Sequence, residues 1–318
     1  MVEQYQTEWV KGEAVSEGVR RCDDRYEIVK SIAERYDRPF SVLDIGANLG
    51  YFGFRLMEDF DCQVTFIEGH PTYADALEEQ CKQNQAGILL TRHFNQEDLR
   101  LLGEVEHFDI VLALSVVHHI QGDVNKTCRL IEKLGDHVIF EMPNEKNACG
   151  QRQVHAWYAG DNWEHIGSGE SHLLDGKKRP IYLSQQSRET MGARYIGVPA
   201  GHPTTVRIES DYERKRISWR NFKEEPRNWI HGINLATFRH FMGRYPSHES
   251  ILESIESILR ARDTEHGDVR PHNFIIGNGL HLIDENDPQH NPSAFKSDLE
   301  CLDEIKRWFA GEAPHYEK

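Results

Sequence analysis

The sequence predicts an α/β fold in which a doubly wound parallel sheet is followed by a smaller α+β module. Short apolar runs alternate with segments of helical spacing as far as about residue 185. Strands that alternate with helices form βαβ units, and the parallel sheet built from such units is covered on both faces. After this point the regular alternation of strand-like and helix-like segments ends. We therefore expect one domain over residues 1–185 and a second module over residues 186–318.

Apolar runs supply the expected strands of the first domain, and the segments between them have helical spacing. The strands are expected in SVLDIG (41–46), QVTFIE (63–68), FDIVLALS (108–115), HVIFEMP (137–143) and RPIYLSQQ (179–186). The helices are expected over residues 51–60, 72–85 and 123–134. Residues 144–180 are mostly polar and rich in Gly, and so long an irregular stretch is typical of a lid or a substrate loop.

The second module shows a different order of elements. A charged, strand-like stretch over 204–219 comes first, and helical spacing follows at 248–262. A turn-rich motif occupies 266–288, and a closing helix is expected over 294–310.

Composition excludes several classes of protein. The 318 residues include 52 Asp and Glu against 37 Lys and Arg, which gives a formal charge of −15. Such a surplus of negative charge disfavours nucleic acid as a partner, because that binding needs cationic side chains. The six cysteines are scattered singly, so we interpret them as reduced and structural. No stretch approaches the ~20 apolar residues of a membrane span, and the start of the chain lacks the apolar core of a secretory signal, which predicts a cytoplasmic protein.

The turn after the first expected strand carries the first chemical signal. In VLDIGANLGYFGF, Gly46 and Gly50 lie between that strand and the next helix. Glycine lets a ligand approach the backbone, and the start of the helix offers unpaired N–H groups. The carboxylate of Asp44 would repel a pyrophosphate, whereas it suits a ligand with an ammonium and a sulfonium group. This pattern favours S-adenosylmethionine over NAD.

Later strand ends add acidic residues in the expected order. Glu68 ends the second strand, where a carboxylate can accept hydrogen bonds from both ribose hydroxyls. Asp98 is expected to accept a hydrogen bond from the adenine amino group. The next strand reaches the carboxyl edge of the sheet at Ser115. The candidate donor-binding residues are Asp44, Gly46, Asn48, Gly50, Tyr51, Glu68, Asp98, Ser115, Arg20 and Arg25.

These residues resemble the class I S-adenosylmethionine-dependent methyltransferases over about the first half of the chain, which implies a Rossmann-like sheet. The segments YQTEW, RRCDDRYEIV, LDIGANLGYFGF, LALSVVHHI, VIFEMP and RPIYLS are similar, in sequence and order, to a narrower family. Its members are bifunctional methyltransferase and kinase enzymes that terminate O-antigen polysaccharides by phosphorylating and methylating the terminal sugar. The resemblance implies that Arg20 and Arg25 line the cofactor or substrate pocket. Arginines on a solvated helix face remain the alternative.

The chemistry of the acceptor decides which residues take part in methyl transfer. A hydroxyl acceptor needs a base, and His118 and His119 are the candidates because imidazole titrates near neutral pH. A phosphate acceptor is already ionised and needs cationic side chains to hold it. The candidates for that role are Arg20, Arg25, Arg152 and the run Lys177–Lys178–Arg179. Packing or helix capping is the alternative for the histidines.

The second chemical signal lies in HGDVRPHNFII and the following LIDEND. His266, Asp268 and Asn273 reproduce the kinase pattern His-x-Asp-x-x-x-x-Asn, and Asp284 follows an apolar strand. The resemblance to the C-lobe of small-molecule and sugar kinases implies that Asp268 accepts a proton from the attacking hydroxyl. It implies that Asn273 and Asp284 hold Mg²⁺ on the phosphates of ATP.

Essential kinase parts are nevertheless missing. Glu285 and Asn286 replace the usual Phe-Gly, no Gly-rich phosphate loop is present, and Lys215 is a weak candidate for the phosphate-binding lysine. Three interpretations stay open for this reduced kinase-like module: an active kinase, a degenerate kinase that positions substrate or forms a dimer, and a false match.

We therefore expect a cytoplasmic S-adenosylmethionine-dependent O-methyltransferase that acts in polysaccharide biosynthesis on a glycan or phosphorylated glycan terminus. A small-molecule acceptor is compatible with the same residues. The alternatives are a bifunctional enzyme that phosphorylates and then methylates its substrate, and a non-catalytic regulator that binds S-adenosylmethionine.

Overall fold

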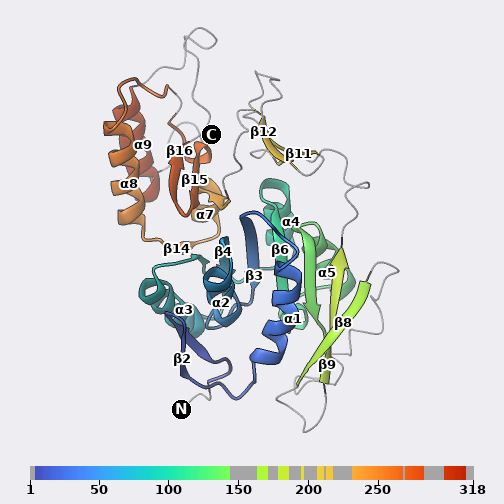
Figure 1. The fold of residues 1–318 in the computed structure, drawn as a ribbon. Helices are drawn as coiled ribbons and strands as arrows, with labels where there is room; N and C mark the ends of the chain where they lie inside the picture. Colours follow the sequence, from blue (N-terminus) through green and yellow to red (C-terminus); the bar gives the residue numbers. More distant parts are fainter. Residues whose placement is uncertain are drawn as a thin grey trace.

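An eight-stranded sheet forms the centre of the protein in the computed structural model (Figure 1). The structure describes residues 4–143, 163–170, 178–185, 195–196, 206–210, 213–217, 231–267, 269–282 and 297–312. The strands follow the order β14-β5-β4-β3-β6-β7-β9-β8. Their bounds are β3 Phe40–Ile45, β4 Cys62–Ile67, β5 Ile88–Leu90, β6 Phe108–Leu114, β7 Gly135–Glu141, β8 Trp163–Glu170, β9 Lys178–Gln185 and β14 Gly243–Tyr245.

Five strands of this sheet are parallel, which confirms the predicted fold class. β3 pairs in parallel with β4 and β6, β4 with β5, and β6 with β7. The chain first adds strands on one side of β3 and then returns to its other side with β6. The crevice at the carboxyl ends of β3 and β6 is therefore the switch point of the topology, where open α/β sheets bind their ligands.

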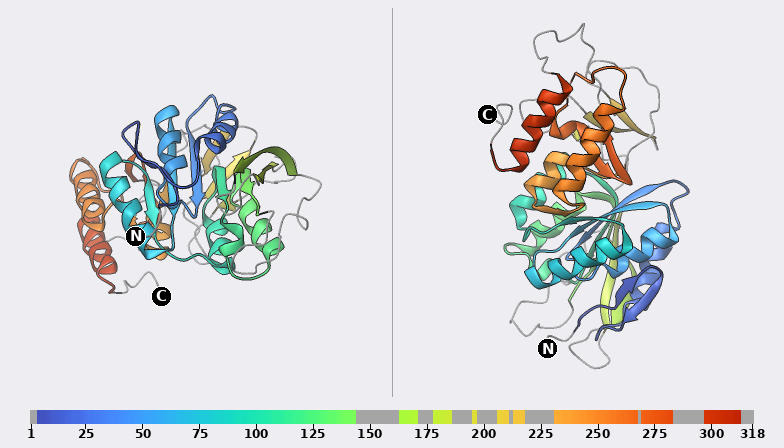
Figure 2. Two further views of the ribbon diagram at one scale, coloured as in Figure 1. Left: turned by 90° about the horizontal axis from the view of Figure 1, so that it is seen from below. Right: turned by 90° about the vertical axis from the view of Figure 1, so that its left-hand side faces the viewer.

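Helices cover both faces of the sheet because the side chains of each strand alternate between two cores. Val42 packs with α1 (Asp23–Ala33), α2 (Tyr51–Asp59) and α3 (Pro71–Asn84). Its neighbour Leu43 belongs to the other core, which includes side chains of α4 (Gln96–Val105) and α5 (Val124–Glu132). Figure 2 shows the two helical layers with the sheet between them. The three helices expected over 51–60, 72–85 and 123–134 correspond to α2, α3 and α5.

A short hairpin that the sequence analysis did not predict precedes the sheet. Strands β1 (Glu8–Val10) and β2 (Glu13–Ser16) pair antiparallel. The Trp9 indole donates a hydrogen bond to Glu58 at 2.7 Å, and Asn84 Nδ2 donates to the Trp9 carbonyl at 3.1 Å. These contacts attach the hairpin to α2 and α3.

The second module contains the elements that the sequence predicts, with small shifts of their ends. Helix α8 (His248–Arg260) and helix α9 (Asp298–Phe309) pack together beside a small antiparallel sheet. That sheet has the order β13 (Ile233–Asn234), β15 (Phe274–Gly277), β16 (Gly279–Leu282). The charged stretch forms an antiparallel hairpin, β11 (Val206–Ser210) and β12 (Glu213–Ile217), with β10 (Tyr195–Ile196) at its side.

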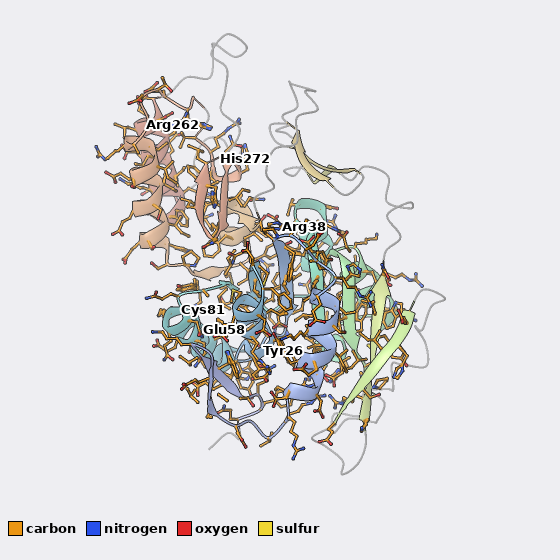
Figure 3. The ribbon with its side chains drawn as sticks, in the orientation of Figure 1. Tyr26, Arg38, Glu58, Cys81, Arg262 and His272 are labelled. Carbon is orange, nitrogen blue, oxygen red and sulfur yellow. The ribbon has the colours of Figure 1, made fainter. Side chains whose placement is uncertain are left out.

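The second module also takes part in the sheet of the first. Helix α7 (Leu235–His240) leads into β14, which pairs antiparallel with β5 at the sheet edge. Phe241 stacks on Phe94 with ring centroids 4.8 Å apart. Arg38 binds the buried Asp109 at 2.8 Å and lies between the sheet and the second module (Figure 3). The division between residues 185 and 186 stays a prediction, but strands from both sides of it share one sheet.

A buried carboxylate joins the two modules. Glu106 follows α4, and its Oε1 accepts hydrogen bonds from the backbone N–H and the side-chain amide of Asn234 and from Thr237 Oγ1, at 2.8–2.9 Å. The first two bonds fix the start of α7, because Asn234 also caps this helix through Thr237 N.

Replacing Glu106 by Gln should destabilise the protein by about 1–2 kcal/mol, because three hydrogen bonds to a charged acceptor become bonds to a neutral one. The free energy of unfolding in urea measures this effect. Glu104→Gln, an exposed residue of α4 two positions earlier, is the control and should change it by less than about 0.5 kcal/mol. Equal stability of the Glu106 variant and the wild type would show that the carboxylate does not clamp the modules.

Candidate active site

A cavity of about 470 Å³ opens at the carboxyl ends of β3, β4 and β6. This is the switch point of the sheet. Its lining combines the Gly turn, the end of β4, the loop between β5 and α4, and the segment after β6. The lining residues are Tyr5, Gln6, Ile45, Gly46, Asn48, Ile67, Glu68, Gly69, His70, Tyr73, Arg92, His93, Phe94, Leu114, Ser115, Val116, His118, His119, Ile120 and Arg179.

The turn after β3 brings the backbone to the cavity. Gly46 has a φ of +71°, and a Cβ on this residue would lie 2.6 Å from Val116 Cγ2. Only glycine satisfies both constraints. The N–H groups of Gly46 and Ala47 donate to the carbonyl of Ile67 at 2.8 and 3.1 Å, which ties the turn to the end of β4.

Glu68 stands directly after β4 and lines the cavity. Its Oε2 accepts a hydrogen bond from Asn48 N and its Oε1 accepts one from His70 N, both at 2.8 Å. Burial raises the pKa of Glu68, and the two backbone N–H groups oppose that rise. Each carboxylate oxygen has a further lone pair, so the side chain can accept two more hydrogen bonds from a ligand.

Asp44 and Asn48 hold buried acceptor atoms close to the turn. Asp44 Oδ2 and Asn48 Oδ1 have no hydrogen-bond partner within the described part of the chain. Burial and the charge of Glu68 raise the pKa of Asp44 to about 7, although Arg25 acts in the opposite direction. Such buried acceptors are costly unless a ligand or water satisfies them.

A chain of polar side chains forms the opposite wall. Ser115 directly follows β6 and has a φ of +61°, a strained value for a residue with a Cβ. Its Oγ accepts hydrogen bonds from Arg20 Nη1 at 3.0 Å and from Arg179 Nη1 at 2.5 Å. Behind this wall, Glu141 forms ion pairs with Arg20 and Arg25. The structure thus brings Arg20, Arg25 and Ser115 together, and Arg179 lines the cavity beside Ser115.

His118 and His119 both line the cavity from the short helix Val117–His119. Their ring centroids are 4.1 Å apart. Burial lowers the pKa of His119, and the charges of Arg179 and His93 lower it further. A neutral imidazole at this position is able to accept a proton at neutral pH.

Six of the ten expected donor-binding residues are absent from the cavity lining: Asp44, Gly50, Tyr51, Asp98, Arg20 and Arg25. Gly50, Tyr51 and Asp98 make internal contacts. The phenol of Tyr51 donates to Asp23 Oδ1 at 2.7 Å. A Cβ on Gly50 would collide with Phe54 and Leu77, so this glycine serves the packing of α2 and α3. Asp98 closes the capping box of α4 with Asn95 and binds Arg92 at 3.0 Å. A direct contact of these residues with the donor stays a prediction.

The cavity also contains residues that the sequence did not single out. Tyr5 and Gln6 precede β1 and line the cavity, and Gly18 packs directly against their backbone. Phe94 was missed because nothing in its sequence neighbourhood marks it. Glu141 lies behind the wall and is not part of the lining, but it offered a usable signal: it is an acidic residue at a strand end, as Glu68 is.

Part of the kinase-like motif falls on described residues. The carboxylate of Asp298 accepts hydrogen bonds from the N–H groups of His266 and Gly267 at 2.7 and 3.1 Å. Asn273 is buried at the end of a short helix, Pro271–Asn273. Asp268 and Asp284 lie outside the described residues, as do Arg152, Lys177, Glu285 and Asn286. Among the described side chains, no group of three His, Cys, Asp or Glu is placed to hold a metal ion.

The family comparison agrees with the geometry of the cavity. Residues 43–137, which run from β3 into β7 and include the turn and Glu68, match the family model described as a methyltransferase domain. This segment is a methyltransferase domain. The protein is a methyltransferase that uses S-adenosylmethionine as its methyl donor.

Solved structures of methyltransferases are similar to this one at low identity. A co-crystal structure of WbdD with a kinase inhibitor is 18% identical, with a TM-score of 0.48, and covers 89% of this chain and 80% of its own. Another structure, described as the bifunctional kinase-methyltransferase WbdD, is 17% identical over 90% of this chain and 80% of its own, with a TM-score of 0.49.

Magnesium protoporphyrin IX methyltransferase from Synechocystis PCC 6803, with bound S-adenosylmethionine, is 12% identical over 52% of this chain and 79% of its own, with a TM-score of 0.40. No curated protein matches the sequence. The helices that the structure describes include none that is both long and apolar enough to cross a membrane.

Proposed function

We propose that this methyltransferase transfers its methyl group to an oxygen atom of a glycan or phosphorylated glycan terminus, in the cytoplasm. One observation carries the proposal: the walls of a single cavity hold a carboxylate suited to the donor ribose and, opposite it, an arginine and two histidines. The carboxylate suits the donor. The histidines suit an acceptor hydroxyl, which must lose its proton, and the arginine suits an acceptor oxygen that is already ionised.

The residues at the turn fit S-adenosylmethionine. Glu68 would accept hydrogen bonds from the ribose hydroxyls, since both of its oxygens have lone pairs left. Gly46 leaves the backbone open to the ligand. Asn48 Oδ1 and Asp44 Oδ2 are the buried acceptors that a cationic methionine moiety would satisfy.

When bound, the donor supplies a methyl group on a positively charged sulfur. The protein then contributes mainly position, because an in-line displacement needs an aligned nucleophile. His118 or His119 would take the proton from a hydroxyl acceptor, whereas Arg179 would hold an acceptor oxygen that is already anionic. The histidines and Arg179 line the same cavity, so the site accommodates both kinds of acceptor.

Incubation with labelled S-adenosylmethionine and cell-surface polysaccharide extracts tests the acceptor. We expect label in the polysaccharide fraction, and phosphatase treatment of the extract distinguishes a phosphorylated terminus from a hydroxyl. Transfer to small metabolites alone would contradict a glycan acceptor.

The second candidate function adds a kinase step at the C-terminal module. It is favoured by Asp298, which fixes the backbone of His266 and Gly267 directly before Asp268. Asn273 and Asp284 would then hold Mg²⁺ on ATP, and Asp268 would accept the substrate proton. Calorimetric titration with ATP and Mg²⁺ should show binding that Asp284→Ala removes. A flat titration of the wild type would rule out the kinase step.

Donor binding should become tighter as the pH rises through about 7. The pKa of Asp44 is raised to about 7, so this carboxyl is largely protonated at pH 6 and ionised at pH 8. The ionised form attracts the positive charges of the donor, and the affinity should therefore rise about tenfold between pH 6 and 8. Equilibrium dialysis at several pH values measures this change.

Asp44→Asn is the control for that pH dependence, because the amide has the same shape and does not titrate. The histidines of the cavity still titrate in this variant, so the difference between the two profiles isolates Asp44. Parallel profiles of wild type and variant would show that Asp44 does not face the donor.

A further inference from the structure

Behind the wall of the cavity, two buried arginines meet one buried glutamate. Arg20 and Arg25 are each 1% exposed, and Glu141 is fully buried. Arg20 Nη2 pairs with Glu141 Oε1, and Arg25 Nη1 lies 3.4 Å from Glu141 Oε2. The two guanidinium groups thus share one carboxylate within the described part of the chain.

This cluster is connected to the cavity through Ser115. Arg20 uses a second nitrogen, Nη1, to donate to Ser115 Oγ, and Arg179 donates to the same oxygen. Arg179 and Ser115 line the cavity, whereas Glu141 does not. Glu141 therefore affects the cavity indirectly: it orients Arg20, and Arg20 in turn binds Ser115 in the lining.

The backbone makes room for this arrangement at two places. A Cβ on Gly169 would lie 2.7 Å from the side chain of Arg25 and 2.9 Å from Glu141 Oε1. Ser115 adopts a left-handed conformation, and its hydroxyl accepts hydrogen bonds from Arg20 and Arg179. Strain in a non-glycine residue persists where the surrounding structure enforces it, and such residues cluster at functional sites.

Stability alone does not explain the cluster. Buried ion pairs contribute little net stability, since the desolvation of the charges offsets their attraction, and an apolar replacement is often as stable. Here the nearby Asp44 is partly protonated near neutral pH, because its pKa is about 7. The pair of arginines consequently carries more positive charge than Glu141 balances, next to a ligand cavity.

We propose that Glu141 is a positioning residue for an anion subsite on this wall of the cavity. Its two oxygens fix Arg20 and Arg25, Arg20 and Arg179 fix the Ser115 hydroxyl, and Arg179 faces the bound anion. The anion is a carboxylate or phosphate group, supplied by the methionine end of the donor or by the acceptor. This inference rests on the proposed function, because it places an anionic group at the same site.

The test compares Glu141→Gln with the wild-type protein and has two arms. In the first, calorimetry gives the affinities for S-adenosylmethionine and for its decarboxylated form. If the donor carboxylate occupies the subsite, the variant should bind S-adenosylmethionine at least tenfold more weakly and the decarboxylated form within twofold of wild type. In the second, inorganic phosphate is titrated with S-adenosylhomocysteine bound. A tenfold loss of phosphate affinity would instead assign the subsite to the acceptor.

Glu132→Gln is the matched control. Glu132 is a half-buried acceptor, with hydrogen bonds from Trp163 at 2.8 Å and Ser184 at 2.5 Å, but it does not line the cavity. The Glu132→Gln variant should leave the affinities measured in both arms unchanged, even if its melting temperature is lower. A merely structural role for Glu141 would give the same pattern as this control.

Unchanged affinities in both arms, in a folded Glu141→Gln protein, would overturn the proposal. If that variant does not fold, Ser115→Ala removes the hydroxyl that joins Arg20 to Arg179 without removing a charge. The same two sets of affinities are then measured for Ser115→Ala. Failure of the wild-type protein to bind S-adenosylmethionine at all would contradict the proposed function instead.

Discussion

Replacing Glu68 by Ala is expected to weaken the binding of S-adenosylmethionine by about 10²-fold or more. The carboxylate faces the cavity at the end of β4 and is held by the N–H groups of Asn48 and His70. In the proposed complex it accepts two hydrogen bonds from the ribose, each worth about 1.5–3 kcal/mol for a charged acceptor. Loss of both bonds corresponds to at least two orders of magnitude in affinity. Equilibrium dialysis with labelled donor measures the change directly.

Two further variants separate this contact from general damage. Glu79→Ala removes an exposed carboxylate from α3 and should leave the affinity unchanged. Glu68→Gln retains one acceptor oxygen and should fall between the wild type and Glu68→Ala. If the Glu68→Ala variant is folded and its donor affinity is within threefold of the wild-type value, the ribose does not bind at Glu68.

The double replacement of His118 and His119 by Ala should lower the methyl-transfer rate by about 10²-fold or more, provided the acceptor is a hydroxyl. Both imidazoles line the cavity, and the lowered pKa of His119 keeps this ring neutral at physiological pH. A neutral ring is the form that accepts a proton. If His119 is the base, the rate should decline only at a pH below the ordinary titration range of histidine, because burial lowers the pKa of this residue.

Single-turnover rates with saturating donor give the cleanest measurement, because they separate the chemical step from product release. His165→Ala, on the exposed face of β8, serves as the control. Near-wild-type turnover of the double variant would show that the acceptor is already ionised. Arg179 would then be the side chain that holds it.

The C-terminal module takes part in shaping the donor cavity. The loop between β5 and α4 supplies Arg92, His93 and Phe94 to the lining. Two of its contacts come from the second module: Thr91 donates to the carbonyl of Met242 at 2.9 Å, and Phe94 stacks on Phe241. The cavity lining therefore depends on a segment about 150 residues further along the chain, so cutting the chain at the predicted boundary would expose this loop.

Local pattern predicted the parts of the site that lie on one βαβ unit. The turn with Gly46 and the carboxylate of Glu68 follow from strand ends, because the carboxyl ends of parallel strands meet at one sheet edge. Asp98 shows the limit of the same reasoning. It lies beyond a strand as expected, but the first turn of α4 uses its carboxylate for a capping box, a competing role that short acidic segments often take.

The sequence by itself determined the alternation of strands and helices, the Gly turn and the acidic residue that follows β4, because each depends on residues close together in the chain. Only the tertiary structure decided that Arg20, Ser115, Glu141 and Arg179 form one cluster and that β14 completes the sheet. These contacts join residues from 64 to more than 150 positions apart. Their formation depends on how α1, β7 and β9 pack, and no local pattern of residues encodes that packing.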